Sequence, residues 1–283
     1  MLTSRFFFMI KRVAIQGIEG SFHYIVSQSY FEEPVEICPY LSFGDVVDSL
    51  TSKNTDIAIM ALENSIAGSI IPNYAHIDDQ DLHITGEFFL EIEHNLMALS
   101  GQKISDIKEV LSHPMALLQC KEFFRHHPHI KLIEDSDTAE VARRIQNNQI
   151  MGVAAIASKE AARIFNLNIL KQSIQTIKHN ETRFVIVERK LEPKNTNIVN
   201  KASVKFLLDH KRGSLAAMLN VMSDCNLNLT KIQSLPKIDT PWKYAFFVDI
   251  TFKSYADYEK GKAIMEIMAE EFKILGEYKN AKK

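Results

Sequence analysis

Short apolar runs alternate with amphipathic segments along most of this chain, and this alternation is the pattern of an α/β fold. Residues 13–16 form a first apolar run, and Phe22, Ile25 and Val26 then have the spacing of one helical face. The same order of apolar run and helical pattern returns over residues 35–50. We therefore predict successive βα units, in which helices are layered on a sheet.

A second series of βα units follows residues 83–99, a segment rich in phenylalanine, isoleucine and leucine that we interpret as a hinge. Predicted strands of this series lie at residues 109–111, 131–134 and 153–156. The chain then returns through residues 170–183, a second hinge passage. We predict two α/β lobes within residues 10–190. Three residues precede helical patterns and are expected to be N-caps: Ser21, Asp137 and Ser158.

Polar segments at residues 63–65, 112–119 and 180–183 border apolar runs of the two predicted lobes. Ligands of α/β proteins bind at the carboxyl ends of strands and in clefts. We expect the three segments to converge in a cleft between the lobes. Taken alone, residues 179–184 are also typical of a polar turn before a surface strand, so this expectation depends on all three segments.

The composition of the chain changes after residue 189. Residues 191–200 are polar and contain Pro193, which is typical of a linker. Residues 201–283 then have the order strand, helix, strand, strand, helix, strand, with Met218 and Met222 on the apolar face of the first helix. This βαββαβ order predicts a ferredoxin-like domain, with an antiparallel sheet and both helices on one face.

The charges of the chain nearly cancel, at a formal net charge of −2, and both signs are interspersed. No basic face for a nucleic acid is indicated, and no apolar run has the ~20 residues of a membrane-spanning helix. Three widely spaced cysteines, Cys38, Cys120 and Cys225, favour reduced thiols in a cytoplasmic protein over a disulfide framework. The first apolar run is too short for a signal peptide, and Met9 is an alternative start to Met1.

Two further motifs suggest ligands that the rest of the sequence does not support. His126-His127-Pro128-His129 has no acidic or thiol partner at the spacing of metal ligands, so we expect no metal. The glycine turn at residues 17–21 lacks the third glycine of a dinucleotide site and the lysine of a P-loop.

Several motifs, in order along the chain, resemble those of the prephenate dehydratase family. They are Glu63-Asn64-Ser65, Ser112-His113-Pro114 with Gln119-Cys120, residues 154–158, and Asn180-Glu181-Thr182-Arg183-Phe184. Near the C-terminus, Gly213-Ser214-Leu215 and Asn228-Leu229-Thr230-Lys231-Ile232 resemble the regulatory ACT domain of that family. The resemblance implies a two-lobed catalytic unit similar to periplasmic binding proteins, followed by an ACT domain at residues 201–283.

The resemblance implies a lyase that converts prephenate to phenylpyruvate, water and carbon dioxide on the route to phenylalanine, without metal or organic cofactor. Prephenate carries two carboxylates and a ring hydroxyl that must leave with a proton. Arg183 has the planar guanidinium that can bind a carboxylate through two hydrogen bonds. We expect it to hold the pyruvyl carboxylate, because tight binding of the departing carboxylate would oppose its loss.

The proton donor of this reaction has two main candidates, and Glu181 is a weaker third, since it is also typical of a solvent-facing salt bridge. The resemblance points to Thr182, but a threonine hydroxyl is a weak acid and needs support from another group. Glu63 is the alternative, since a carboxyl in a closed cleft can have its pKa raised. Other side chains are expected to contact the substrate: Asn64, Ser65, Ser112, Gln119, Asn180 and Phe184.

The ACT-like region implies an effector site, in a homodimer or homotetramer. Its expected residues are Gly213, Ser214, Leu215, Asn226, Asn228 and Leu229. Gln233 and Leu235 stand where phenylalanine-binding family members carry glutamate and arginine, so regulation by L-phenylalanine is left open. Two alternative functions are also left open: action on arogenate in place of prephenate, and a non-catalytic amino-acid sensor with the same two lobes.

Overall fold

The computed structural model describes residues 10–189, 196–209, 211–237 and 243–282. Contacts between residues divide the chain into two compact units. The first unit contains the described residues up to Gly68 together with Leu90–Phe184, and the second contains Ser69–Phe89 together with the described residues from Val185 onward. The second unit thus draws on two separate stretches of the chain, whereas the sequence predicts domains that follow one another in chain order.

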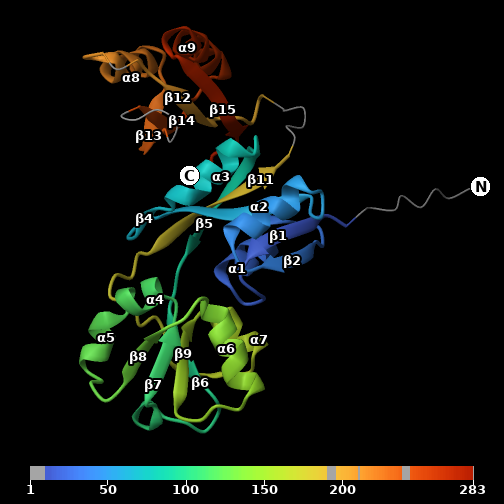
Figure 1. The fold of residues 1–283 in the computed structure, drawn as a ribbon, viewed down its shortest axis with the longest axis vertical. Helices are drawn as coiled ribbons and strands as arrows, with labels where there is room; N and C mark the ends of the chain where they lie inside the picture. Colours follow the sequence, from blue (N-terminus) through green and yellow to red (C-terminus); the bar gives the residue numbers. More distant parts are fainter. Residues whose placement is uncertain (1–9, 190–195, 210, 238–242, 283) are drawn as a thin grey trace, which may run out of the picture. The chain divides into compact units, whose positions relative to one another are not determined.

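The first lobe of the first unit has the predicted βα units (Figure 1). Its elements are β1 (Arg12–Gln16), α1 (Phe22–Tyr30), β2 (Glu36–Tyr40), α2 (Phe43–Thr51), β3 (Ile57–Asn64) and the first residue of β4 (Gly68–Ser69). Strand β1 lies between β2 and β3 and is parallel to both. Val13, Ala14 and Ile15 are fully buried, as expected for a central strand with helices on its faces. The Ser21 hydroxyl caps α1 by accepting from the Tyr24 amide.

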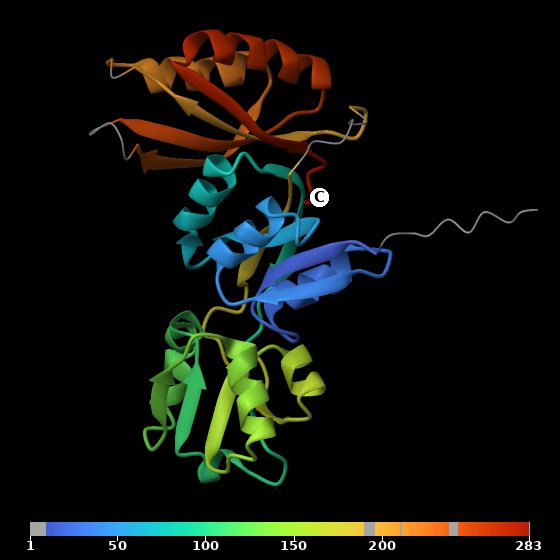
Figure 2. The same ribbon diagram turned by 45° about the vertical axis from the view of Figure 1, so that its right-hand side comes forward.

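The second lobe has a five-stranded sheet in the order β10-β6-β9-β7-β8. Its strands are β6 (Asn95–Ala98), β7 (Glu109–Ser112), β8 (Lys131–Glu134), β9 (Val153–Ala157) and β10 (Asn168–Lys171). Its helices are the short η1 (Ile104–Asp106), α4 (Pro114–Gln119), α5 (Lys121–Arg125), α6 (Thr138–Asn147) and α7 (Lys159–Ile164). Figure 2 shows the sheet between α4 and α5 on one face and α6 and α7 on the other. The predicted caps are present, since Asp137 and Ser158 accept from the amides of Glu140 and Ala161.

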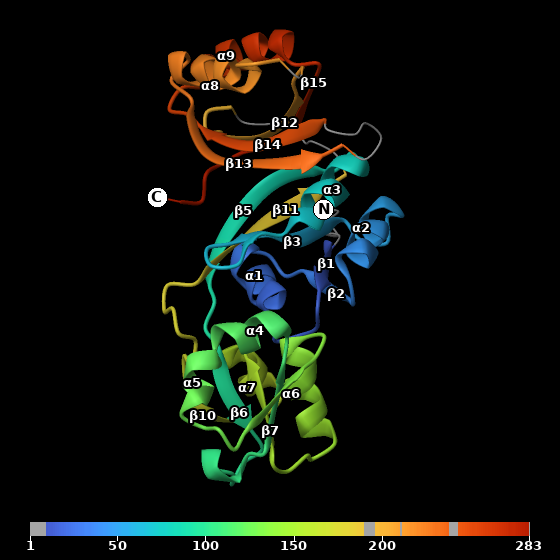
Figure 3. The same ribbon diagram turned by 60° about the vertical axis from the view of Figure 1, so that its left-hand side comes forward.

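The second unit contains the βαββαβ order that the sequence predicts. Its elements are α3 (Ile71–Asp79), β5 (His83–Glu91), β11 (Glu181–Glu188), β12 (Lys201–Leu207), α8 (Ser214–Asp224), β13 (Asn228–Pro236), β14 (Tyr244–Thr251), α9 (Tyr255–Met268) and β15 (Glu271–Tyr278). Strands β12 to β15 form an antiparallel sheet in the order β13-β14-β12-β15. Both helices cover one face of it (Figure 3), and Met218 and Met222 lie in the core between them, as predicted.

The other face of this antiparallel sheet packs on α3 and β5. Tyr74 of α3 makes an edge contact with Phe247, with 5.5 Å between ring centroids. The ammonium of Lys201 lies 2.8 Å from a carboxylate oxygen of Glu87, and these side chains are only 6% and 0% exposed. This buried ion pair joins β12 to β5. The grouping of Ser69–Phe89 with the C-terminal strands follows from such contacts.

Strands β5 and β11 each begin in one unit and end in the other. The predicted hinge at residues 83–99 therefore consists of β5, a short connection, and β6, which is a strand of the second lobe. No helix among the described residues is long and apolar enough to cross a membrane. Residues 1–9, most of the predicted linker (190–195), His210 and residues 238–242 lie outside the described residues.

Candidate active site

The end of β3 and the start of β11 bring two of the predicted polar segments together. The Ser65 amide donates to the Glu181 carbonyl at 2.8 Å. In return, the Glu181 amide donates to the Ser65 hydroxyl at 2.9 Å. These reciprocal hydrogen bonds set the polar residues that follow β3 against those that open β11.

Asn64 lies at the centre of the hydrogen bonds in this region. Its side-chain carbonyl accepts from the backbone amides of Ile66 and Ala67, at 3.0 and 2.8 Å. Because a backbone N–H can only donate, these two contacts fix which end of the amide is oxygen. The NH₂ group then donates to Asn180 Oδ1 at 2.6 Å and to Thr182 Oγ1 at 2.9 Å.

Thr182 is consequently the acceptor in its contact with Asn64. No other side-chain hydrogen bond involves its hydroxyl within the described residues, so the hydroxyl proton can be donated to a ligand. The residue is 7% exposed. A buried hydroxyl whose oxygen already accepts a hydrogen bond is polarised, and this strengthens the hydrogen bond that it donates.

The second lobe contributes Gln119, the last residue of α4. Its side-chain oxygen accepts from Asn180 Nδ2 at 2.9 Å and lies 2.8 Å from Nε2 of His94. Gln119 Nε2 forms no hydrogen bond within the described residues, and the side chain is partly exposed. We call Asn64, Gln119, Asn180 and Thr182 the amide cluster. Four residues predicted from three distant segments therefore meet in one hydrogen-bonded group.

The other predicted site residues lie around this cluster or away from it. Ser112 is fully buried and donates to the Ile156 carbonyl at 2.7 Å, a contact that joins β7 to β9 within the sheet. Phe184 is 1% exposed and packs edge-on against the His23 ring at 4.9 Å. Glu63 is partly exposed and precedes Asn64 on β3.

Arg183 is 4% exposed and lies between Thr182 and Phe184 on β11. Successive side chains of a strand point to opposite faces. Thr182 and Phe184 therefore lie on one face of β11 and the Arg183 side chain leaves from the other. The guanidinium and the Thr182 hydroxyl do not share a face of this strand.

The glycine turn before α1 forms a close contact between the two lobes. The Gly20 carbonyl accepts from the Ser158 hydroxyl at 2.6 Å. A Cβ on Gly20 would lie 2.8 Å from the Ala161 Cα, and Gly20 has a φ of +83°, so a side chain is disfavoured on both counts. A Cβ on Gly17 would lie 3.0 Å from a carboxylate oxygen of Asp137, whose pKa is raised mainly by burial. The two glycines thus allow α6 and α7 of one lobe to approach the first turn of the other.

Comparisons with known proteins identify the family of this chain. The family model described as prephenate dehydratase matches residues 13–192. The chain belongs to the prephenate dehydratase family. Arogenate dehydratase 2 of Petunia hybrida is 39% identical over 225 residues, which cover 80% of this chain and 57% of that protein. Arogenate dehydratase/prephenate dehydratase 2, chloroplastic, of Arabidopsis thaliana is 34% identical over 278 residues, covering 94% of this chain and 72% of that protein.

A solved structure of the family has the same fold. The prephenate dehydratase from Staphylococcus aureus subsp. aureus Mu50 has a TM-score of 0.81 and 27% identity, covering 94% of this chain and 99% of that chain. The dehydratase fold thus extends over the C-terminal strands, beyond the residues that the family model matches.

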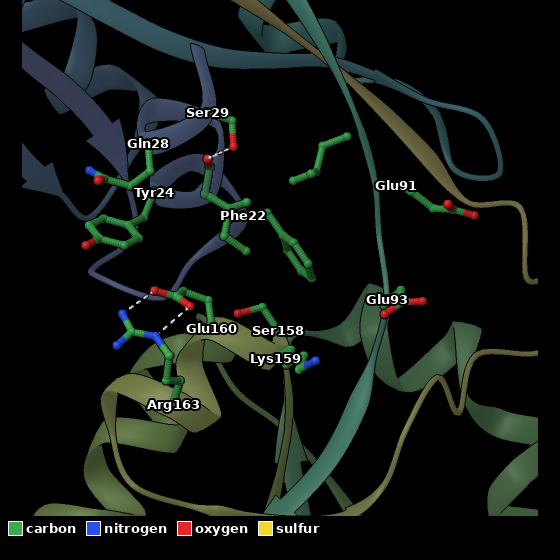
Figure 4. A pocket seen from close by; sticks show the side chains of 12 residues that line it. Phe22, Tyr24, Gln28, Ser29, Glu91, Glu93, Ser158, Lys159, Glu160 and Arg163 are labelled. Atoms are coloured by element: carbon green, nitrogen blue, oxygen red, sulfur yellow. Dashed lines mark hydrogen bonds and ion pairs between the residues drawn. The ribbon is translucent and has the colours of Figure 1, made fainter. Parts of the chain in front are cut away.

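In this member of the dehydratase family, a cavity of about 580 Å³ is lined by residues of α1, α7 and the end of β5. Phe22 and Ser158 are among the side chains that line it, and so are Glu160 and Arg163, which form an ion pair (Figure 4). None of the four residues of the amide cluster lines it. We place the candidate site at the cluster and not in this cavity, because the cluster holds the ordered donors that the family's reaction requires.

His94 belongs to the site, although the sequence patterns did not predict it. It is 4% exposed, contacts Gln119, and packs edge-on against Phe22 with 5.9 Å between ring centroids. A signal was present in the sequence, since Glu93-His94-Asn95 interrupts an otherwise apolar stretch. The composition of that stretch by itself indicates only a hinge.

The expected effector residues form two groups at opposite ends of α8. Gly213 begins the helix with a φ of +89°, and the Ser214 hydroxyl donates to Asp209 at 2.6 Å. Leu215 packs against the core of the unit. Beyond the C-terminus of α8, Asn226 and Asn228 make long contacts to Asp257 and Thr251, and Leu229 follows on β13. An α8 of 11 residues separates the two groups by ~16 Å along the helix.

No group of three or more histidine, cysteine, aspartate or glutamate side chains is placed to hold a metal within the described residues. In the motif at residues 126–129, the rings of His127 and His129 lie 6.1 Å apart in an edge-on arrangement.

Proposed function

We propose that this chain is a prephenate dehydratase, which converts prephenate to phenylpyruvate, water and carbon dioxide in phenylalanine biosynthesis. Its family membership supports the reaction class. The observation that carries the assignment of the site is the amide cluster, in which every hydrogen bond around Asn64 has a fixed direction and the Thr182 hydroxyl is turned into a donor.

The reaction needs a donor at one oxygen and little else from the protein. The C–O bond to the ring hydroxyl breaks and that oxygen leaves as water, taking up one proton. The C–O electron pair leaves with that oxygen, whereas the bond between the ring and its carboxylate gives its electron pair to the ring, which becomes aromatic as carbon dioxide departs. A donor that strengthens as charge develops on the leaving oxygen lowers the barrier selectively.

Thr182 is our choice for that donor. Its proton is too tightly held for simple transfer, but the hydrogen bond from Asn64 to its oxygen makes the hydroxyl a stronger donor. Glu63 remains the alternative source of the transferred proton. Its side chain leaves β3 on the face opposite to Asn64, because consecutive residues of a strand alternate.

Gln119 is our choice for a neutral contact to the substrate. Its oxygen is occupied by two donors, which leaves the NH₂ group to meet a carboxylate or carbonyl oxygen of prephenate. We propose that Arg183 supplies positive charge for the pyruvyl carboxylate, with Asn180, Ser65, Ser112 and Phe184 shaping the site. The Arg183 side chain leaves β11 on the face opposite to Thr182. An Arg183→Ala variant therefore tests directly whether the guanidinium takes part in binding the substrate.

The decisive experiment is an assay of the purified protein on prephenate, following phenylpyruvate by its absorbance. We expect Thr182→Ala to lower kcat by roughly 10²-fold, the scale for loss of one donor to a developing charge. Thr182→Ser keeps a hydroxyl and is the matched control. Turnover no faster than the spontaneous acid-catalysed reaction would exclude the enzyme. The same assay with arogenate, following phenylalanine, decides between the two substrates, and binding without turnover would favour a sensor.

We further propose that residues 201–283 are an ACT domain and that the protein is a homodimer or homotetramer. The βαββαβ order supports this, and so does the separation of the two expected effector groups by the length of α8. One copy cannot bring both groups to one small ligand, whereas pairing of two copies could. Calorimetric titration with L-phenylalanine and sedimentation with and without it test the proposal. Gln233 and Leu235 lead us to expect weak binding or none.

We propose a cytoplasmic location. Cys120 and Cys225 are buried and unpaired, Cys38 is partly buried, and burial raises the pKa of Cys120 to about 12. Such thiols are typical of a reducing compartment. Fractionation of the source cells with antibody detection tests this.

A further inference from the structure

We propose that His94 is a positioning residue, whose Nε2–H fixes the orientation of the Gln119 amide and thereby the donors that face prephenate. This inference rests on the proposed function and adds a residue to its site. His94 lies in the connection between β5 and β6, at a hinge passage of the chain.

Each hydrogen bond between Asn64 and Gln119 has a defined direction. The backbone amides of Ile66 and Ala67 fix Asn64, and Asn64 Nδ2 then fixes Asn180 Oδ1 as an acceptor. Asn180 Nδ2 must therefore be the group that faces Gln119, which makes that atom of Gln119 an oxygen. A reversed Gln119 amide would set two NH₂ groups against each other.

The orientation of Gln119 determines the tautomer of His94. Its Nε2 lies 2.8 Å from Gln119 Oε1, and an oxygen can only accept, so Nε2 carries the proton. Nδ1 then carries a lone pair. This atom is buried and has no hydrogen-bond partner among the described residues.

That unpaired nitrogen indicates why a histidine is present. Leaving a buried acceptor unsatisfied costs about 1–3 kcal/mol, which an apolar ring of similar size would not cost. Burial lowers the pKa of His94, the hydrogen bond to Gln119 acts in the opposite direction, and the charge of His113 lowers it further. The ring is therefore neutral near pH 7, and the group that it offers is a single N–H.

The backbone and the ring of His94 are both held in place by neighbouring residues. The His94 amide donates to Gln175 Oε1 at 3.0 Å, and the His94 carbonyl accepts from the Ile174 amide at 2.8 Å. The edge of the ring meets Phe22 of α1. Both hinge passages thus hold the residue, and its N–H reaches Gln119 of the second lobe from a fixed backbone.

Without the His94 proton, Gln119 loses one of the two donors that hold its oxygen inward. The amide could then rotate and withdraw its NH₂ group from the substrate. His94→Phe should lower kcat/KM by roughly 10- to 100-fold, whereas His94→Gln, which keeps an N–H at a similar reach, should stay within about fivefold of the native protein.

A double-mutant cycle distinguishes positioning from a general structural role. On a Gln119→Leu background, His94→Phe should have little further effect, because the amide through which it acts is absent. If the fold-losses of kcat/KM caused by the two single substitutions multiply in the double variant, the two residues act independently and the proposal is wrong. A His94→Gln variant that folds, by circular dichroism, yet is as inactive as His94→Phe would also overturn it.

The tautomer can be observed without any substrate. A long-range ¹H–¹⁵N spectrum of the full chain, with His94→Gln to assign the signal, should show Nε2 protonated and Nδ1 unprotonated near pH 7. A protonated Nδ1 would overturn the proposal whatever the activity. The proposed function could fail while the positioning role stands. In that case the native protein would show no turnover but would have the expected tautomer, and the Gln119 side-chain amide signal would be unchanged in His94→Gln and changed in His94→Phe.

Discussion

Lowering the pH from 7 to 5 should destabilise the first lobe through His23. This ring lies between Phe43 and Phe184, at centroid distances of 5.4 and 4.9 Å, and its Nε2 has no hydrogen-bond partner within the described residues. Burial lowers its pKa from 6.5 to about 3. The folded protein therefore keeps His23 neutral, while the unfolded chain binds a proton as the pH falls below 6.5.

The sign and size of the effect follow from this difference. Stability is unaffected by His23 above pH 6.5 and is lost between pH 6.5 and 3, at ~1.4 kcal/mol per pH unit. At pH 5 the expected loss is ~2 kcal/mol. Because Phe184 follows directly on Arg183, protonation of His23 should also disturb the strand that carries the site.

Urea denaturation of the native chain and of His23→Phe, each at pH 7 and pH 5, measures this. The difference between the two proteins cancels the contributions of other titrating groups, including Asp137. The native chain should lose about 2 kcal/mol more than the variant between these pH values. His129→Gln, at an exposed position, is the control and should keep the native dependence. If His23→Phe has the same dependence on pH as the native chain, the reasoning about the buried ring is wrong.

Three other changes test separate parts of the structure. Gly276→Ala would place a Cβ 2.1 Å from the Ile84 carbonyl oxygen, so thermal denaturation should show a loss of at least about 2 kcal/mol, and a native melting temperature would contradict the close approach of β15 and β5. Lys201→Met removes the cation from the fully buried Glu87 carboxylate and should cost about 3–5 kcal/mol in urea denaturation, whereas a neutral result would show that the pair is hydrated. Asn64→Asp exchanges a donor for an acceptor that would face Asn180 Oδ1, so kcat should fall by roughly 10²-fold and the melting temperature should fall with it, which steady-state assays and melting curves measure together; native values of both would contradict the hydrogen-bond directions.

Local sequence patterns were sufficient for the elements whose formation depends on neighbouring residues. The βα units, the caps at Ser21, Asp137 and Ser158, and the βαββαβ order were all predicted and are present. Helix α3 was not predicted, because Pro72, Asn73 and two aspartates break up its apolar pattern. It is stabilised by distant contacts, such as that of Tyr74 with Phe247.

For the site, sequence motifs identify residues, but their contacts depend on parts of the chain that are distant in sequence. The resemblance gave Asn64, Gln119, Asn180 and Thr182, and the structure brings them together. It also gave Ser112 as a substrate contact, but the hydroxyl of that residue is engaged within the sheet, which only the pairing of β7 with β9 reveals. The role of His94 depends on Gln119, which lies 25 residues further along the chain.

The contacts of α3 and β5 with β12 to β15 bear on how new regulatory properties could be built into such a chain. Exchanging the C-terminal region for that of a relative, with a junction near residue 196, would remove the partners of Tyr74, Asp78 and Glu87 while leaving these side chains behind. A functional chimera would therefore need Ser69–Phe89 of the same relative as well. The unit that is exchanged is thus encoded by two separate stretches of the gene, which must change together.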